Sequence, residues 1–221
     1  MAFLSPVVDY HGLARRYLIP PSVSGCGRSL TAVRWAGEAM ATGANPYEPG
    51  DVSVRALVRS DADLLRLLRL EALAESPDAY VETLVDAQSC DWVARADRLS
   101  PSEPADRAAY FAFVDHRPVG MIVAGYGIPN ESPFLAAMWV HPDFRRRRAG
   151  RALVLRALAF LRAAGQQRVA LWVTETHVGV FKFYQSLGFQ VTGVRAPLRP
   201  GSETTILELA LELPDSPQAH S

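Results

Sequence analysis

The spacing of hydrophobic residues along the chain predicts one strong strand–turn–helix unit, residues 134–164. Phe134 to Val140 is a nearly unbroken apolar run of strand length, which predicts a strand covered on both faces. From Ala149 onward, apolar residues recur on one side of a predicted helix: Leu153, Val154, Ala157, Leu158 and Leu161. Gly165 is placed to end this helix in the left-handed conformation. The rest of the fold should be built around this unit.

The residues before this unit predict a strand, two helices and a hairpin. Residues 52–58 alternate apolar and polar side chains, as an edge strand does. Ser60 and Asp63 have the spacing of a capping box at the start of a helix that ends before Pro77. A second helix is predicted over residues 89–99, and its apolar side should consist of Trp92, Val93, Ala96 and Leu99. Two further strands, residues 110–114 and 119–126, should pair across residues 115–118.

The residues after the unit predict a strand, a helix and two strands. The strand covers residues 169–173, the helix covers 178–187 and ends at Gly188, and the last two strands cover 189–194 and 204–213. A strand, a helix and a strand joined by short turns form a right-handed crossover with parallel strands. Ligands of such units lie beyond the carboxyl ends of the strands, which here is the turn after Val140.

Composition limits the class of protein. Of the 221 residues, 49% are hydrophobic and 21% are charged, as in globular proteins. Lys plus Arg and Asp plus Glu balance at 23 each, so no nucleic-acid partner is expected. The chain lacks a run of about 18 apolar residues and a secretory leader, so we expect no membrane association and a cytoplasmic protein. The two cysteines, Cys26 and Cys90, predict neither a disulfide framework nor a metal site.

The patterned residues form one predicted domain, residues 52–213. Residues 1–51 combine weak patterning with several Pro and Gly residues, which predicts a weakly structured extension. Residues 214–221 should form a flexible tail.

The turn of the central unit is a candidate anion site. Arg145 to Arg148 lie between the predicted strand and the first turn of the predicted helix. A helix N-terminus presents unpaired backbone N–H groups and a partial positive charge. This combination favours an anion such as a pyrophosphate.

Two motifs in order resemble the GNAT family of acyl-CoA-dependent N-acyltransferases. Residues 140–150, VHPDFRRRRAG, are similar to the family pattern V-x-P-x-x-[RQ]-x-x-G-x-G. Residues 171–173, LWV, are followed by His177, Tyr184 and Gly188-Phe189, where the family has L-x-V, Asn, a helix with a tyrosine, and Gly-Phe. The resemblance implies an α+β fold of three layers, αβα. Its mixed and largely antiparallel sheet would have a central pair of parallel strands that splay apart.

The resemblance also implies acetyl-CoA as the cosubstrate, no metal, and a primary amine of a small molecule or peptide as the acceptor. Backbone N–H groups from Arg145 to Arg151 would hold the pyrophosphate. The pantetheine arm would pair with residues 138–140, the N–H of Val140 would polarise the thioester carbonyl, and Tyr184 would protonate the departing thiolate. The coenzyme-binding residues implied are Met138, Trp139, Val140, Arg145, Arg146, Arg147, Arg148, Ala149, Gly150, Arg151 and His177.

The chain departs from the family pattern at two positions. Arg148 replaces the first glycine of the phosphate turn. An arginine fits this position if the backbone φ is negative and is strained if φ is positive. A second register, Arg147 to Ala152, also fits a looser form of the motif, although the spacing from Pro142 favours the first. His177 replaces an asparagine, and a neutral imidazole can take over only part of its hydrogen bonding.

Several alternatives stay open at the level of sequence. Tyr184 could serve packing against Phe189 as well as proton donation. No general base is assigned, since Glu82, Glu131, Glu175 or ordered water could each receive the proton. Four acids, Glu75, Asp78, Glu82 and Asp86, could attract a cationic amine. A GNAT-like domain that binds acyl-CoA without turnover is the alternative function, and a homodimer is left open.

Overall fold

The computed structural model describes residues 52–100, 105–128 and 131–213, so the expectations for the first 51 residues and for 214–221 lie outside the described residues. The strands are β1 (Val52–Ala56), β2 (Arg107–Val114), β3 (Arg117–Gly125), β4 (Phe134–Val140), β5 (Arg168–Thr174), β6 (Gln190–Pro197) and β7 (Thr205–Glu212). The helices are α2 (Ala62–Glu75), α3 (Leu84–Gln88), α4 (Trp92–Leu99), α5 (Ala149–Ala163) and α6 (Val178–Gln185). Short 3-10 turns cover η1 (Arg59–Asp61), η2 (Pro77–Ala79) and η3 (Pro142–Phe144).

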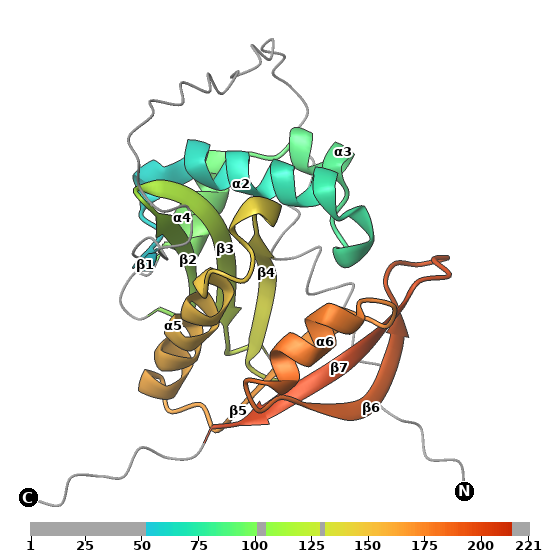
Figure 1. Cartoon of the computed structure of the whole chain (residues 1–221). Helices are drawn as coiled ribbons and strands as arrows, with labels where there is room; N and C mark the ends of the chain where they lie inside the picture. The colour runs from blue at the N-terminus through green and yellow to red at the C-terminus, as the bar shows by residue number, and fades with distance from the viewer. Residues whose placement is uncertain (1–51, 101–104, 129–130, 214–221) are drawn as a thin grey trace, which may run out of the picture.

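The strands form one sheet of seven in the order β1-β2-β3-β4-β5-β7-β6 (Figure 1). Neighbouring strands are antiparallel except for β4 and β5, which are parallel. The predicted fold class, a mixed and largely antiparallel sheet with a central parallel pair, is therefore confirmed. Among the described residues, no helix is long and apolar enough to cross a bilayer.

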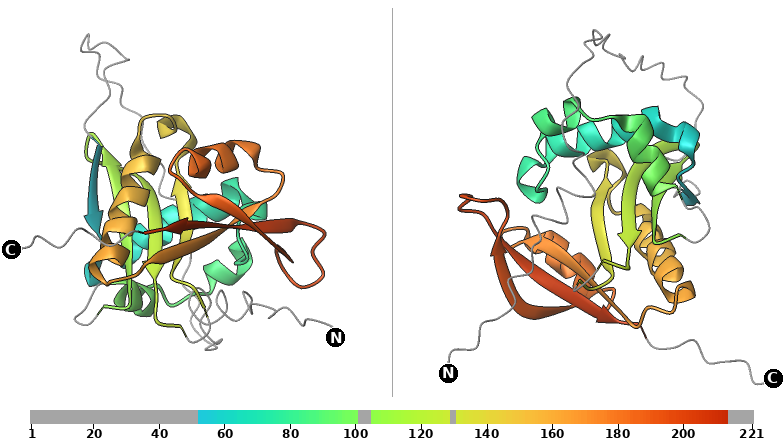
Figure 2. Two further views of the ribbon diagram at one scale, coloured as in Figure 1. Left: turned by 90° about the horizontal axis from the view of Figure 1, so that it is seen from below. Right: turned by 180° about the vertical axis from the view of Figure 1, so that it is seen from behind.

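Helices cover both faces of the sheet and define two cores (Figure 2). Alternate residues of β2 point to opposite faces, so Tyr110 packs with the cluster around α5 and Phe111 packs with the cluster around α2 and α4. The predicted apolar side of α5 is confirmed, since Leu153, Val154, Ala157, Leu158 and Leu161 are all buried. Gly165, at φ +72°, ends this helix as predicted.

Three local predictions were wrong in detail. The capping box of Ser60 and Asp63 does not form, because Asp61 accepts the N–H of Val58 at 2.8 Å and binds Arg55 of β1 instead. Val93 is exposed, and Arg95 takes the buried position on the apolar side of α4. The hairpin turn is shorter than predicted, with Asp115 and His116 both at positive φ, as in a type I′ turn.

The parallel pair β4–β5 splays apart almost at once. The two strands share one paired position, Phe134 opposite Ala170, and beyond it they diverge (Figures 1 and 2). Ala137 in β4 has a φ of +52°, and the β3–β4 register shifts beside it. Such a bulge bends its strand, and here it turns β4 away from β5. The space between the carboxyl halves of β4 and β5, called the gap below, is therefore lined by unpaired strand edges.

Candidate active site at the splayed strands

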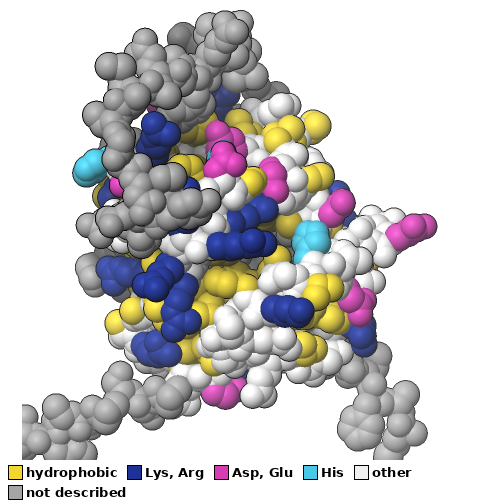
Figure 3. Space-filling model, viewed as in Figure 1, with side chains coloured by type: hydrophobic (Ala, Val, Ile, Leu, Met, Phe, Trp, Pro, Cys, Tyr) yellow, Lys and Arg dark blue, Asp and Glu magenta, His cyan; other side chains and the backbone are white. Residues whose placement is uncertain are grey.

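The N-terminus of α5 opens beside the end of β4, as the sequence predicts. The first hydrogen bond within the helix runs from the N–H of Ala152 to the carbonyl of Arg148 at 3.0 Å. The side chain of the N-cap residue, Arg148, makes no capping hydrogen bond, and the N–H groups of Ala149, Gly150 and Arg151 have no partner within the helix. Side chains of Lys and Arg gather on the face that carries α5, with apolar side chains between them (Figure 3). The turn thus has the charge and the donors that an anionic group requires.

Arg148 adopts the conformation that glycine prefers. Its φ is +66° and its ψ is −5°, in the left-handed region, directly before α5. A side chain with a Cβ is strained there, by about 1–2 kcal/mol. Of the two possibilities for Arg148, a negative φ without strain and a positive φ with strain, the structure has the second. It also agrees with the register in which Arg148 replaces the first glycine of the motif.

We expect Arg148→Gly to stabilise the protein by about 0.5–1 kcal/mol. Glycine removes the left-handed strain, and the greater freedom of glycine in the unfolded chain offsets part of the gain. Urea unfolding of the variant measures the difference. Arg148→Ala is the matched control, because it removes the same charge and keeps the Cβ. Equal stability of the Gly and Ala variants would show that the turn stores no strain at this residue.

Arg145 braces the turn from within the protein. Its Nε donates to the carbonyl of Val140 at 3.0 Å, and its guanidinium contacts Glu75 at 2.8 Å. Its backbone N–H donates to the carbonyl of Pro142 at 3.2 Å. The backbone N–H of Arg145, which the sequence analysis assigned to a pyrophosphate, is therefore engaged within the protein.

Glu75 ties the end of α2 to the turn. Its carboxylate accepts hydrogen bonds from Trp139 Nε1 at 3.2 Å, from Arg145, and from Ser76. Burial by itself would raise the pKa of Glu75, but the hydrogen bonds from Ser76, Arg145 and Trp139 outweigh it and hold this pKa below its ordinary value. Glu75 is therefore an ionised bracing group and a poor proton acceptor.

The open edge of β4 supplies backbone groups to the gap. Val140 lies opposite Gly120, and the next residue, His141, donates to the carbonyl of Val119 at 2.8 Å. Bonded and non-bonded pairs alternate along an antiparallel ladder, so the N–H of Val140 points away from β3 and toward the gap. This orientation is the one that an oxyanion donor needs.

Gly150 lets three elements meet at the mouth of the gap. A Cβ on this residue would lie 3.1 Å from Met138 Cε and 3.4 Å from Phe183 Cζ. The first turn of α5 is therefore packed closely against β4 and α6, and only a small residue fits. The same close approach keeps the N–H of Gly150 accessible to a ligand phosphate.

Tyr184 packs as predicted and lies at the gap. Its ring centroid is 5.4 Å from that of Phe189 and 5.1 Å from that of Phe183. The side chain is buried, and burial raises the pKa of Tyr184, with a smaller contribution from the nearby Tyr80. The phenol therefore stays neutral at ordinary pH, which fits a proton donor and excludes a base.

His177 is the N-cap residue of α6, but its side chain makes no capping hydrogen bond. Its backbone N–H donates to the carbonyl of Thr174 at 2.9 Å and its carbonyl accepts the N–H of Val180 at 2.9 Å. The connection from β5 to α6 is thus held by the main chain. A contact of the imidazole with a pantetheine arm stays a prediction.

The candidate bases do not converge on the gap. Glu82 is fully buried and is bound by Arg69 at 2.9 Å and by Arg95 at 2.7 Å. Glu175 pairs with Arg195 at 3.1 Å, and Glu131 precedes β4, at the opposite end of the strand from Val140. The acids predicted to attract an amine are likewise engaged in part, since Glu75 is bound by Arg145 and Asp86 accepts the hydroxyl of Thr83.

Several residues near the gap were missed by sequence reasoning: Arg69, Tyr80, Arg95 and Arg199. Arg69 and Arg95 carry a local signal, because each replaces an apolar residue on the buried side of an amphipathic helix. Tyr80 and Arg199 lie in segments without periodicity. Only the folded chain shows that Tyr80 reaches β4, where its hydroxyl donates to the carbonyl of Met138 at 3.0 Å.

Comparison with known proteins defines the class. The model of the acetyltransferase (GNAT) family matches residues 66–189, more than half of the chain. This protein therefore belongs to the GNAT acetyltransferase family. An uncharacterized N-acetyltransferase of Methanocaldococcus jannaschii is 34% identical over 82 residues, which cover 35% of this chain and 36% of the relative. The match thus spans about a third of the length of this curated relative.

Solved structures share the fold. The putative acetyltransferase yncA from Salmonella typhimurium, solved with its cofactor acetyl-CoA, has a TM-score of 0.62 at 16% identity, covering 76% of this chain and 99% of that chain. The PaiA N-acetyltransferase from Thermoplasma acidophilum, solved with coenzyme A, has a TM-score of 0.55 at 19% identity, covering 72% of this chain and 98% of that chain. The ribosomal-protein-S18-alanine N-acetyltransferase from Escherichia coli has a TM-score of 0.55 at 14% identity, covering 77% and 99%.

Proposed function

We propose that this protein is an N-acetyltransferase that uses acetyl-CoA to acetylate a primary amine of a small molecule or peptide by direct transfer. The observation that carries the proposal is the gap itself. The N–H of Val140 points into it, the uncapped N-terminus of α5 opens at its mouth, and the phenol of Tyr184 lies beside it. A backbone donor, an anion site and a proton donor are the groups that transfer from a thioester requires.

Each of these groups has a separate task in the proposed reaction. The N–H groups of Ala149, Gly150 and Arg151 hold the pyrophosphate of the coenzyme at the helix N-terminus. The N–H of Val140 polarises the thioester carbonyl and stabilises the negative charge that develops on its oxygen. Tyr184 gives its proton to the sulfur as the carbon–sulfur bond breaks.

Acetyl-CoA should release its thiol in the presence of this protein only when a primary amine is also present. A thiol assay over a panel of small amines and short peptides measures the release, and mass spectrometry should find one acetyl group added to the accepted amine. A tertiary amine of similar size is the control, because it has no proton to lose after attack. Tight coenzyme binding without thiol release from any amine would contradict the proposal.

That outcome would support a second function, an acyl-CoA-binding domain without turnover. One observation favours it: Glu82, one of the candidate bases, is enclosed by two arginines. The two functions differ in one measurement, because both predict coenzyme binding and only the enzyme predicts an acetylated product.

A further inference from the structure

One short segment bridges the two strands that no longer pair with each other. On one side of the gap, the hydroxyl of Tyr80 donates to the carbonyl of Met138 in β4 at 3.0 Å. On the other side, the hydroxyl of Thr174 in β5 donates to the carbonyl of Asp78 at 2.7 Å. Residues 77–82, called the bridging segment below, therefore cross between β4 and β5 where their backbones diverge.

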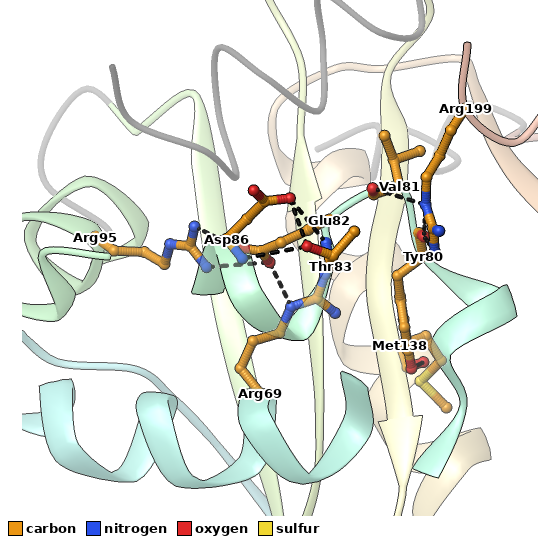
Figure 4. A network of polar contacts seen from close by, with 9 residues as sticks. All are labelled: Arg69, Tyr80, Val81, Glu82, Thr83, Asp86, Arg95, Met138 and Arg199. Carbon is orange, nitrogen blue, oxygen red and sulfur yellow. Dashed lines mark hydrogen bonds and ion pairs between the residues drawn. The ribbon is translucent and has the colours of Figure 1, made fainter. Parts of the chain in front are cut away.

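A buried charge network holds this segment from the side of α2 and α4. Glu82 lies between Arg69 and Arg95, which approach its carboxylate from opposite sides (Figure 4). All three side chains are buried. The guanidinium of Arg69 also lies 4.4 Å from the centroid of the Tyr80 ring, within the range of a cation–π contact. The position of Tyr80 is thus coupled directly to the network.

Arg199 holds the same segment from the opposite side. It extends from the connection between β6 and β7 and lies along the segment (Figure 4). Its guanidinium donates to the carbonyl of Tyr80 at 2.9 Å, of Val81 at 3.1 Å and of Pro77 at 2.5 Å. Contacts from α2, α4, β5 and the β6–β7 connection therefore fix the backbone on both sides of Tyr80.

A phenol held in this way is placed for chemistry. The hydroxyl of Tyr80 donates its hydrogen to the carbonyl of Met138, which lies two residues before Val140. The phenol oxygen keeps lone pairs that can accept a further hydrogen bond. The gap therefore contains a second tyrosine hydroxyl that the reaction described above does not use.

We propose that Tyr80 is a further catalytic residue, whose phenol oxygen accepts a hydrogen bond from the N–H of the attacking amine and aims its nitrogen at the thioester carbonyl. The inference rests on the proposed acetyl transfer and deepens it. Arg69, Glu82, Arg95 and Arg199 are positioning residues, because they fix the bridging segment rather than contact the reacting atoms.

The proposed step balances without a further reactant. The amine nitrogen forms a bond to the carbonyl carbon, and the carbon–sulfur bond breaks. The amine loses its proton to solvent water, Tyr184 gives its proton to the sulfur, and water returns a proton to Tyr184, while Tyr80 keeps its hydrogen on Met138 throughout. Both phenols begin and end neutral. Neutral phenols agree with the environment, since burial raises the pKa of Tyr80 to about 12 and also raises the pKa of Tyr184.

A double-mutant cycle tests the role, with Tyr80→Phe, Tyr184→Phe and the double variant compared for an accepted amine. Tyr80→Phe should lower kcat by about 30–100-fold, while the Kd for acetyl-CoA, measured by calorimetry, changes less than about twofold. The double variant should lose about the product of the two single losses, because Tyr80 acts on the attacking amine and Tyr184 acts on the leaving sulfur. Tyr126→Phe is the matched control: its hydroxyl also donates to a backbone carbonyl, that of Ala105, and it should keep the full rate.

Two results would overturn the role of Tyr80. One is a wild-type rate for Tyr80→Phe, and the other is a loss that appears only as a higher Kd for acetyl-CoA at an unchanged kcat. Unchanged coenzyme binding shows that each variant is folded. If the intact protein acetylates no amine, the proposed function fails and the role of Tyr80 fails with it, whereas an active intact protein with an equally active Tyr80→Phe overturns the role of Tyr80 alone.

Discussion

Tyr184→Phe is expected to lower kcat for acetyl transfer by about 10²–10³-fold, the range lost when a positioned acid is removed. The change removes one hydroxyl and keeps the ring that packs between Phe183 and Phe189. Burial of Tyr184 raises its pKa, so the phenol is protonated at every ordinary pH and can only donate. Without it, the thiolate must leave unprotonated or take its proton from water.

Steady-state kinetics with an accepted amine measure this loss, and thermal unfolding shows whether the variant keeps its stability. The pH profile of the intact protein is a second readout. A phenol donates only below its pKa, and the pKa of Tyr80 is raised to about 12 and that of Tyr184 is raised as well. The rate should therefore show no falling limb below about pH 10. A full rate for Tyr184→Phe with unchanged stability would show that Tyr184 serves packing and not proton donation.

Glu82→Gln is expected to destabilise the fold by about 3–5 kcal/mol, because it leaves two buried arginines without their counter-charge. Glu82 has no exposed surface, and Arg69 and Arg95 are each 1% exposed. Arg69 NH1 and NH2 and Arg95 Nε already have no hydrogen-bond partner among the described residues, so the carboxylate is the main group that compensates these charges. The amide keeps the shape of the side chain, removes the charge and replaces one of the two acceptor oxygens with an NH2 donor.

Urea unfolding measures this loss, and Asp97→Asn is the matched control. Asp97 pairs with Arg59 at 3.0 Å, but with 48% and 72% of the two side chains exposed, so this pair should contribute less than about 1 kcal/mol. A difference below about 1 kcal/mol between the two variants would contradict the importance of burial. It would also weaken the case that the network fixes the bridging segment.

Local patterns predicted the elements that carry most of the site. The continuous apolar run of β4 and the helical spacing of α5 are strong signals, and Pro142 marks the turn between them, so both elements appear where they were expected. The capping glycine at Gly188 and the contact of Tyr184 with Phe189 were predictable for the same reason, since both lie within one turn of a helix end.

A distant residue competes for a local group at three positions, and at the first of them it makes the local prediction wrong. Ser60 and Asp63 have the spacing of a capping box, but Arg55 in β1 binds Asp61 at 2.6 Å, and α2 begins at Ala62 with Asp61 as its N-cap residue. Arg145 has the position of a phosphate ligand in the motif, yet Glu75, 70 residues earlier, accepts its guanidinium. Glu82 has the character of a general base until Arg69 and Arg95 enclose it.

The sequence by itself determined the family, the order of the elements, the arginine-rich turn before α5 and the tyrosine of α6. These features depend on side chains a few residues apart, whose spacing fixes their geometry. The tertiary structure alone decided the left-handed conformation of Arg148, the bulge at Ala137 that opens the gap, and the approach of Tyr80 to Met138 across 58 positions of the chain. Those features depend on which distant segments pack together, because packing selects the partner of each polar group and the strain that each backbone position must accept.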